Sequence, residues 1–173
     1  MIHYILSATD SSKITRLSFI LAAALTLLPT QAFAQATGNL DLSGTVAATC
    51  NVTVTPVGGV ADSLPLGAAQ TDLTVASVNE TCNDPDGYTL TAQSSQSSVL
   101  TPVGTSTDSV PYSFRFGGTV SDLSGGGAVT VTDVNAATGA AGVDKSVQIS
   151  YANPGFIAAD TYTDTITFTI AAK

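Results

Sequence analysis

The sequence has little positive charge and few of the residues on which catalysis depends. Its 173 residues include 5 Lys and Arg against 13 Asp and Glu, one His and no Trp. A net charge of −8 leaves no basic surface for a polyanion, so nucleic acid is excluded as a partner. The one histidine, His3, precedes a predicted cleavage site, so the mature chain lacks the residue that nucleophile pairs and many zinc sites need. We therefore expect no enzyme activity, no catalytic residue, no cofactor and no metal site.

Acidic residues alone give little support to a different chemistry. Most stand beside Gly, Pro, Asn or Thr, where turns and strand exteriors place them. Asp84 and Asp86 form the densest pair, which would suit either a calcium ion or a turn. Pro85 and Gly87 favour the turn, and the further ligands of an EF-hand loop are missing.

The first 34 residues are typical of a secretory signal peptide. Lys13 and Arg16 precede an apolar run from Leu17 to Leu28, and Ala32-Phe33-Ala34 follows as a small-x-small cleavage site. The run is too short to cross about 30 Å of hydrocarbon. We expect residues 1–34 to be removed, Gln35 to begin the mature chain, and the protein to be exported with no integral membrane segment.

Only two cysteines are present, Cys50 and Cys82. Neither has a neighbouring base or cation that would make a thiol reactive, and an even number in an exported protein predicts a disulfide. This bond would hold the strands that carry the two cysteines side by side.

Strand periodicity accounts for nearly all of the remaining chain. Apolar or small residues occupy every even position from Leu40 to Thr55, and a second alternating run from Leu73 to Cys82 is interrupted near Ala76, as in a β-bulge. A last strand is predicted over Thr161 to Ile170. Its apolar face contains Tyr162, Ile166, Phe168 and Ile170, with Asp164 as the one polar exception.

These strands, joined by Gly, Pro and Asn turns, predict an all-β antiparallel sandwich of immunoglobulin-like kind. Phe114 and Phe116 alternate with Arg115, so we expect the two rings in the core and the arginine in a surface charge pair. Tyr162 resembles the tyrosine whose hydroxyl closes a Greek-key corner.

The order of the motifs has a particular resemblance. Gly44 to Val52 reads G-x-V-x-x-x-C-x-V, the second cysteine precedes the G-Y-T-L of Gly87 to Leu90, and the chain closes with the alternating run Ala158 to Ile170. This order resembles pilin subunits assembled by the chaperone/usher pathway and the related spore coat protein U domains.

The resemblance implies an incomplete sandwich over residues 45–173, in which the last strand is missing and a neighbour's strand completes the fold. No further strand is expected after Ile170. The arm at residues 35–44 is the candidate donor strand, with Gly38, Leu40 and Leu42 on one face. The acceptor strand would present Tyr162, Ile166, Phe168 and Ile170.

The function implied is that of an exported structural subunit of a surface fibre, a pilus or fimbria, with a role in adhesion or biofilm. Its partners would be copies of itself, a periplasmic chaperone and an outer-membrane usher. Alternatives stay open: the arm could belong to one long strand within its own domain, and the protein could be a coat protein or a monomeric secreted module that binds carbohydrate or another surface ligand.

Overall fold

The computed structural model describes residues 35–173, so the predicted signal peptide lies outside the described residues. The described chain contains eleven strands and no helix, hence none that could span a membrane. The strands are β1 (Cys50–Pro56), β2 (Gln70–Cys82), β3 (Tyr88–Ser94), β4 (Val99–Pro102), β5 (Val110–Pro111), β6 (Ser113–Phe116), β7 (Thr119–Ser121), β8 (Val129–Val134), β9 (Val143–Tyr151), β10 (Tyr162–Thr163) and β11 (Ile166–Ala172).

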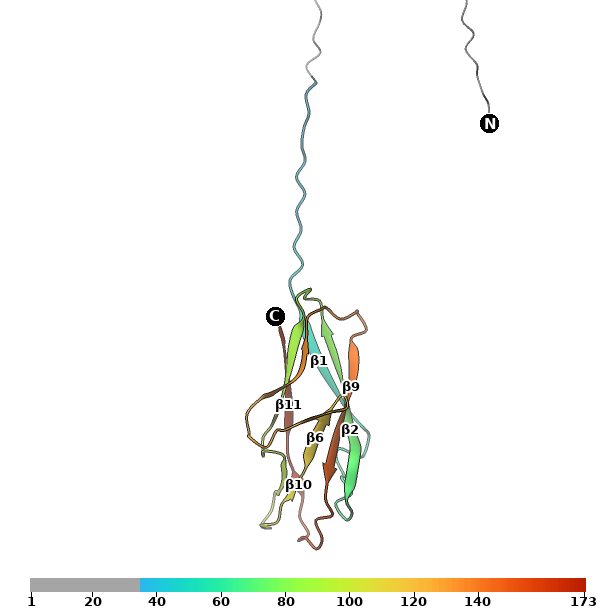
Figure 1. The fold of residues 1–173 in the computed structure, drawn as a ribbon, viewed down its shortest axis with the longest axis vertical. Coiled ribbons are helices and arrows are strands. Elements are labelled where there is room, and N and C mark those ends of the chain that lie inside the picture. The colour runs from blue at the N-terminus through green and yellow to red at the C-terminus, as the bar shows by residue number, and fades with distance from the viewer. Residues whose placement is uncertain (1–34) are drawn as a thin grey trace, which may run out of the picture. The chain divides into compact units, whose positions relative to one another are not determined.

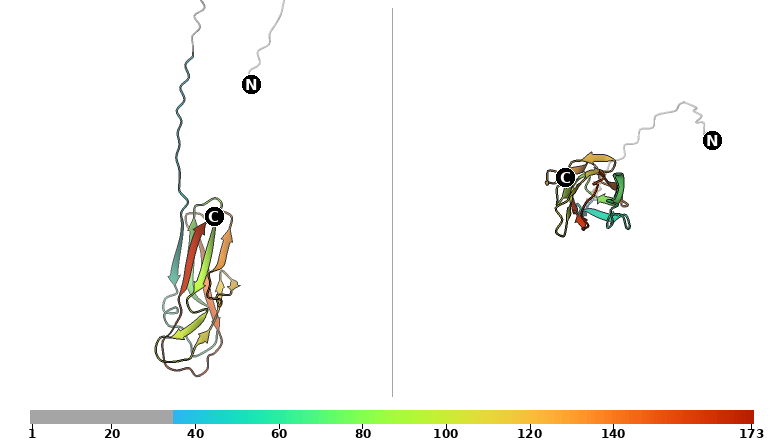
Figure 2. Two further views of the ribbon diagram at one scale, coloured as in Figure 1. Left: turned by 90° about the vertical axis from the view of Figure 1, so that its left-hand side faces the viewer. Right: turned by 90° about the horizontal axis from the view of Figure 1, so that it is seen from below.

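The strands form two layers (Figures 1 and 2). One layer is a five-stranded sheet in the order β1-β2-β9-β6-β7, and the other contains the ladders β11-β3-β8 and β10-β4-β5. Every ladder is antiparallel. The prediction of an all-β antiparallel sandwich is confirmed, while its immunoglobulin-like topology stays a prediction.

The core lies between the layers, where alternate residues of the central strands are buried. Phe114 and Phe116 on β6 are 1% and 2% exposed, so their predicted place in the core is confirmed. Their ring centroids lie 6.3 Å and 5.6 Å from that of Phe168 on β11. The inner face of β11 therefore packs across the interior against the opposite layer.

The predicted disulfide is present and joins the first two strands. Cys50 and Cys82 are bonded and are also partners in the β1–β2 ladder. The prediction that strand structure begins at Leu40 is wrong, because residues 35–49 belong to no strand. The physical reason is that β2 ends at Cys82, opposite Cys50, so earlier residues have no neighbouring backbone in β2 to pair with.

Two irregularities mark the longer strands. Register shifts in the β2–β9 ladder between Gln70 and Leu73 and between Thr74 and Ala76 confirm the predicted bulge. The continuous last strand predicted over Thr161 to Ile170 is wrong, because Asp164 and Thr165 separate β10 from β11. The side chain of Asp164 accepts hydrogen bonds from Ser94, Ser95 and Tyr112, which replaces strand pairing at this point.

The turn predicted at the acidic cluster is also present. The N–H of Gly87 donates to the carbonyl of Asp84 at 3.1 Å, and Gly87 has a φ of 96°, which favours glycine. A Cβ on Gly87 would lie 2.0 Å from the carbonyl oxygen of Val134. Among the described residues there is no group of three or more His, Cys, Asp or Glu arranged to hold a metal ion.

Candidate functional site

The most unusual feature of the domain is a core that is incomplete on one side. The inward-facing residues of β3 and β9 are buried, whereas those of β11, Ile166, Phe168 and Ile170, are only half-buried. On β1, Val52 is half-buried and Val54 is 44% exposed. The two strands with an unfinished apolar face are therefore β1 and β11.

Both strands also lie at a sheet edge. In the described chain β1 pairs only with β2, and β11 pairs only with β3. The backbones of β1 and β11 come within 8 Å of each other at the Cα level, but no ladder joins them. An unpaired edge beside exposed apolar residues is a template for an additional strand. We call this region, formed by β1, β10 and β11, the open edge.

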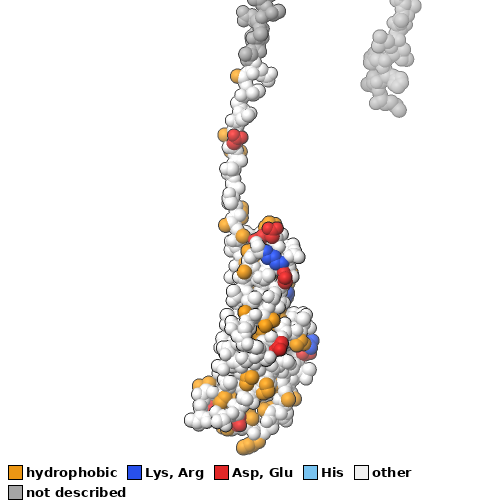
Figure 3. All heavy atoms as spheres, turned by 60° about the vertical axis from the view of Figure 1, so that its left-hand side comes forward, with side chains coloured by type: hydrophobic (Ala, Val, Ile, Leu, Met, Phe, Trp, Pro, Cys, Tyr) orange, Lys and Arg blue, Asp and Glu red, His pale blue; other side chains and the backbone are white. Residues whose placement is uncertain are grey.

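The open edge widens into a cavity of about 550 Å³ around β10 and the start of β11. Its apolar lining comes from both layers and from the loop after β1: Leu64, Leu66, Val75, Leu100, Tyr112, Ile149 and Ile166. Figure 3 shows hydrophobic side chains gathered toward the end of the domain away from the C-terminus. The cavity therefore lies against apolar side chains of both layers.

Three acidic residues stand in the cavity lining, Asp62, Asp160 and Asp164, and Asp164 is the one at the break between β10 and β11. The Asp164 carboxylate accepts hydrogen bonds from Ser94 Oγ at 2.5 Å, Tyr112 Oη at 2.6 Å and Ser95 Oγ at 2.9 Å. Burial acts to raise its pKa, but these bonds and the N–H of Thr165 outweigh it, so the pKa of Asp164 lies below its usual value. Burial and the bond to Asp164 raise the pKa of Tyr112. Asp164 is therefore an ionised group whose oxygens are already satisfied by the protein.

Tyr162 lies beside the same cavity, on β10. Its hydroxyl donates to the carbonyl of Ala158 at 2.9 Å, four residues upstream. This is the bond predicted from the resemblance to a tyrosine corner. It fixes the chain where it enters β10 and so positions one end of the open edge.

The predicted donor residues are fully accessible. Leu40 and Leu42 are 82% and 85% exposed, and Gly38 has no atom within 4 Å of the position of a Cβ. Every residue from 35 to 49 is exposed, and none of them belongs to a strand. Exposure of two leucines on one face of a polar segment leaves an apolar stripe available to a partner.

A buried polar cluster between the layers was missed by sequence reasoning. Glu80 on β2 is 0% exposed and accepts hydrogen bonds from Tyr88 Oη at 2.7 Å and Thr132 Oγ1 at 2.9 Å. Lys145 Nζ lies 3.5 Å from the carboxylate. Burial and the bond to Glu80 raise the pKa of Tyr88. The signal was available, because Glu80 shares the apolar face of its strand with Val78.

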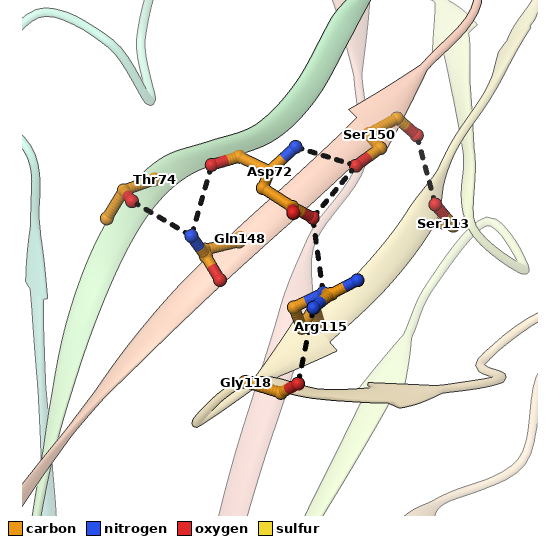
Figure 4. Close-up of polar contacts among 7 residues, drawn as sticks. All are labelled: Asp72, Thr74, Ser113, Arg115, Gly118, Gln148 and Ser150. Carbon is orange, nitrogen blue, oxygen red and sulfur yellow. Dashed lines mark hydrogen bonds and ion pairs between the residues drawn. The ribbon is translucent and has the colours of Figure 1, made fainter.

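The predicted surface role of Arg115 is confirmed. Its Nε lies 3.1 Å from the Asp72 carboxylate, at the bulge of β2 (Figure 4). Asp72 has a φ of 50°, and its N–H donates to Ser150 Oγ at 2.8 Å. Gln148 Nε2 donates to the Asp72 carbonyl, so the network ties the bulge to β9 and stabilises the outer face of the sheet.

The arrangement is suited to binding an extended peptide. It offers unpaired backbone groups, a half-buried apolar row and a cavity beside them. A comparison with protein-family models and a search of the curated proteins find no match to this chain.

Proposed function

We propose that the protein is an exported structural subunit that assembles into a surface fibre, in which residues 35–44 of one copy add as a strand to the open edge of the next. The observation that carries the proposal is the coincidence of an unfinished core along β11 with an accessible apolar stripe at Leu40 and Leu42. Main-chain bonds to the free edge of β11 would supply affinity, and the leucines would supply the missing core.

Leucine burial and main-chain hydrogen bonds together would be sufficient for a stable contact between two subunits. Burying two leucines contributes about 1.5–3 kcal/mol each, and each ladder hydrogen bond adds about 0.5–1.5 kcal/mol. Since β1 comes close to β11, the incoming strand has to move β1 outward where the two backbones approach. The finer identity, a pilin of the chaperone/usher kind with a chaperone and an usher as partners, follows from the motif order and is part of the proposal.

The test is the size distribution of the secreted protein at matched concentration. Leu40→Asp with Leu42→Asp places charges on the stripe, and an unpaired charge cannot be buried in an apolar groove without a large cost. We expect the unaltered protein to form long assemblies and this variant to be monomeric. The control is Asn39→Asp with Ser43→Asp, which adds the same charge on the opposite face of the arm and should leave assembly intact.

Two results would reject the proposal. One is an unaltered protein that stays monomeric and does not bind a peptide copying residues 35–49, which would favour a secreted binding module. The other is equal loss of assembly in both charge variants, which would show that net charge, rather than the stripe, controls association.

A further inference from the structure

A second apolar feature lies where the open edge ends. Phe156, in the loop between β9 and β10, is fully exposed. Beside it is a hollow of about 350 Å³ lined by Leu66, Ile157 and Tyr162 and by one acid, Asp160, whose carboxylate accepts hydrogen bonds from backbone N–H groups. Leu66, Asp160 and Tyr162 line both this hollow and the larger cavity, so the two adjoin. A large exposed aromatic beside a partly apolar hollow is a candidate contact surface.

The direction of the added strand decides what reaches this hollow. Every ladder in the domain is antiparallel, and we expect the same of a strand that pairs with β11. β11 ends at Ala172, whereas β10, which precedes it, begins at Tyr162. An antiparallel strand therefore starts beside Ala172 and brings its C-terminal residues to Tyr162 and the hollow.

Side-chain parity restricts the register. Directly opposite residues of an antiparallel pair point to the same face of the sheet. Phe168 and Ile166 face the interior, so the leucines of the arm must lie opposite even-numbered residues of β11. One such register places Leu40 opposite Phe168 and Leu42 opposite Ile166.

Asp164 selects this register among its neighbours. With Leu40 opposite Phe168, Gly44 lies opposite Asp164 and adds no side chain against the carboxylate. A shift of two residues in one direction places Leu42 opposite Asp164, and in the other direction Val46, which sets an apolar side chain against an ionised group. In the selected register Val46 lies opposite Tyr162, beside the hollow.

We propose that Val46 of each copy sits in the hollow beside Phe156 of the next copy and forms a second contact of the joint, beyond the donor strand. The occupant is a second copy of this chain, since Val46 is itself 87% exposed and follows the arm directly. The inference rests on the proposed function. It assigns Phe156 to the interface between subunits and fixes the orientation of one subunit against the next.

The test is disulfide trapping in the full mature chain, which has no free cysteine in its described residues. Val46→Cys combined with Phe156→Cys should give a ladder of covalent multimers on mild oxidation, because disulfides need Cα atoms within about 7 Å. The control combines Val46→Cys with Val120→Cys, a residue of β7 that is 60% exposed. We expect at least about tenfold less cross-linking in the control, with mass spectrometry locating the bridge and the native Cys50–Cys82 bond.

The outcomes separate the two proposals, since assembly is measured on the same samples before oxidation. Assembly with a specific 46–156 bridge supports both. Assembly without this bridge, or with equal bridging in the control, overturns the Phe156 contact and leaves the fibre. No assembly overturns both.

As a second variant, Phe156→Ser should leave the circular dichroism of the domain unchanged and speed subunit release by at least about tenfold. An unchanged release rate would contradict the contact.

Discussion

At the scale of the residue, we expect the buried carboxylate of Glu80 to be a local determinant of stability. Its oxygens accept bonds from β3 and β8, and its cation partner Lys145 comes from β9. The cluster therefore links both layers through one fully desolvated group. Removal of one member of such a pair leaves the others unsatisfied, which costs more than the pair contributes.

We expect Glu80→Ala to lower the free energy of unfolding by about 3–5 kcal/mol, because the buried hydroxyls of Tyr88 and Thr132 lose their acceptor and Lys145 loses its counter-charge. Chemical denaturation followed by circular dichroism measures the change. Asp86→Ala, which removes an exposed acid, should stay within about 0.5 kcal/mol of the unaltered protein. An equally small effect at Glu80 would contradict the role of the cluster.

Asp164 should make stability depend on pH. Its pKa in the folded state lies below the value near 4 expected of an unfolded aspartate, so the ionised group stabilises the fold above that value. This stabilisation is lost as the pH falls through the folded pKa. Asp164→Asn should lower the free energy of unfolding by about 1–3 kcal/mol at neutral pH and give a shallower loss below pH 4, measured by denaturation across pH. If the stability of the Asp164→Asn variant falls as steeply with decreasing pH as that of the unaltered protein, Asp164 is not a source of the pH dependence. Asp86→Asn is the matched control.

At the scale of the element, β1 depends on the disulfide more than on its own packing. It has one neighbour, β2, and its inward face is at most half-buried. The bond between Cys50 and Cys82 fixes the start of β1 against the end of β2.

Replacing Cys50 and Cys82 together by Ala should lower the free energy of unfolding by about 3–4 kcal/mol, as expected for the loop of 32 residues in the chain-entropy model. Denaturation of the oxidised protein and of the double variant measures this difference. A loss below about 1 kcal/mol would mean that the ladder alone holds β1. Two free thiols in the exported protein, detected by mass spectrometry, would show that the disulfide does not form there.

Sequence periodicity predicted most strands because each has one buried and one exposed face. That physical requirement explains the alternation of β2 and β11 and the position of Phe114 in the core. Periodicity failed where a partner decides the outcome. Leu40 and Leu42 alternate as strand residues do, yet they form none in the single chain, because a strand exists only against a neighbour.

Sequence reasoning also missed the break at Asp164 and the cluster at Glu80. Both are acids on apolar faces, and their structural roles depend on hydroxyl donors 52 residues away in the chain, Tyr112 for Asp164 and Thr132 for Glu80. The cavity and the Phe156 hollow arise from loops whose course no pattern predicts. The candidate site could therefore be assigned to a strand from the sequence, but its shape could not.

At the scale of the whole molecule, the domain has a core that is unfinished along one edge. In the proposed function, the half-buried face of β11 is completed by the apolar stripe at Leu40 and Leu42 of another copy. When one surface of a chain binds a different surface of the next copy, the contact is heterologous and produces open chains of subunits rather than closed dimers.

The most direct measurement is amide hydrogen exchange on the assembled protein and on the monomeric variant with Leu40→Asp and Leu42→Asp. The account predicts that residues 36–46 and the amides on the free edge of β11 are unprotected in the monomer and become protected together in the assembly, because each forms ladder bonds with the other. Assemblies in which residues 36–46 exchange as fast as in the monomer would contradict the central claim.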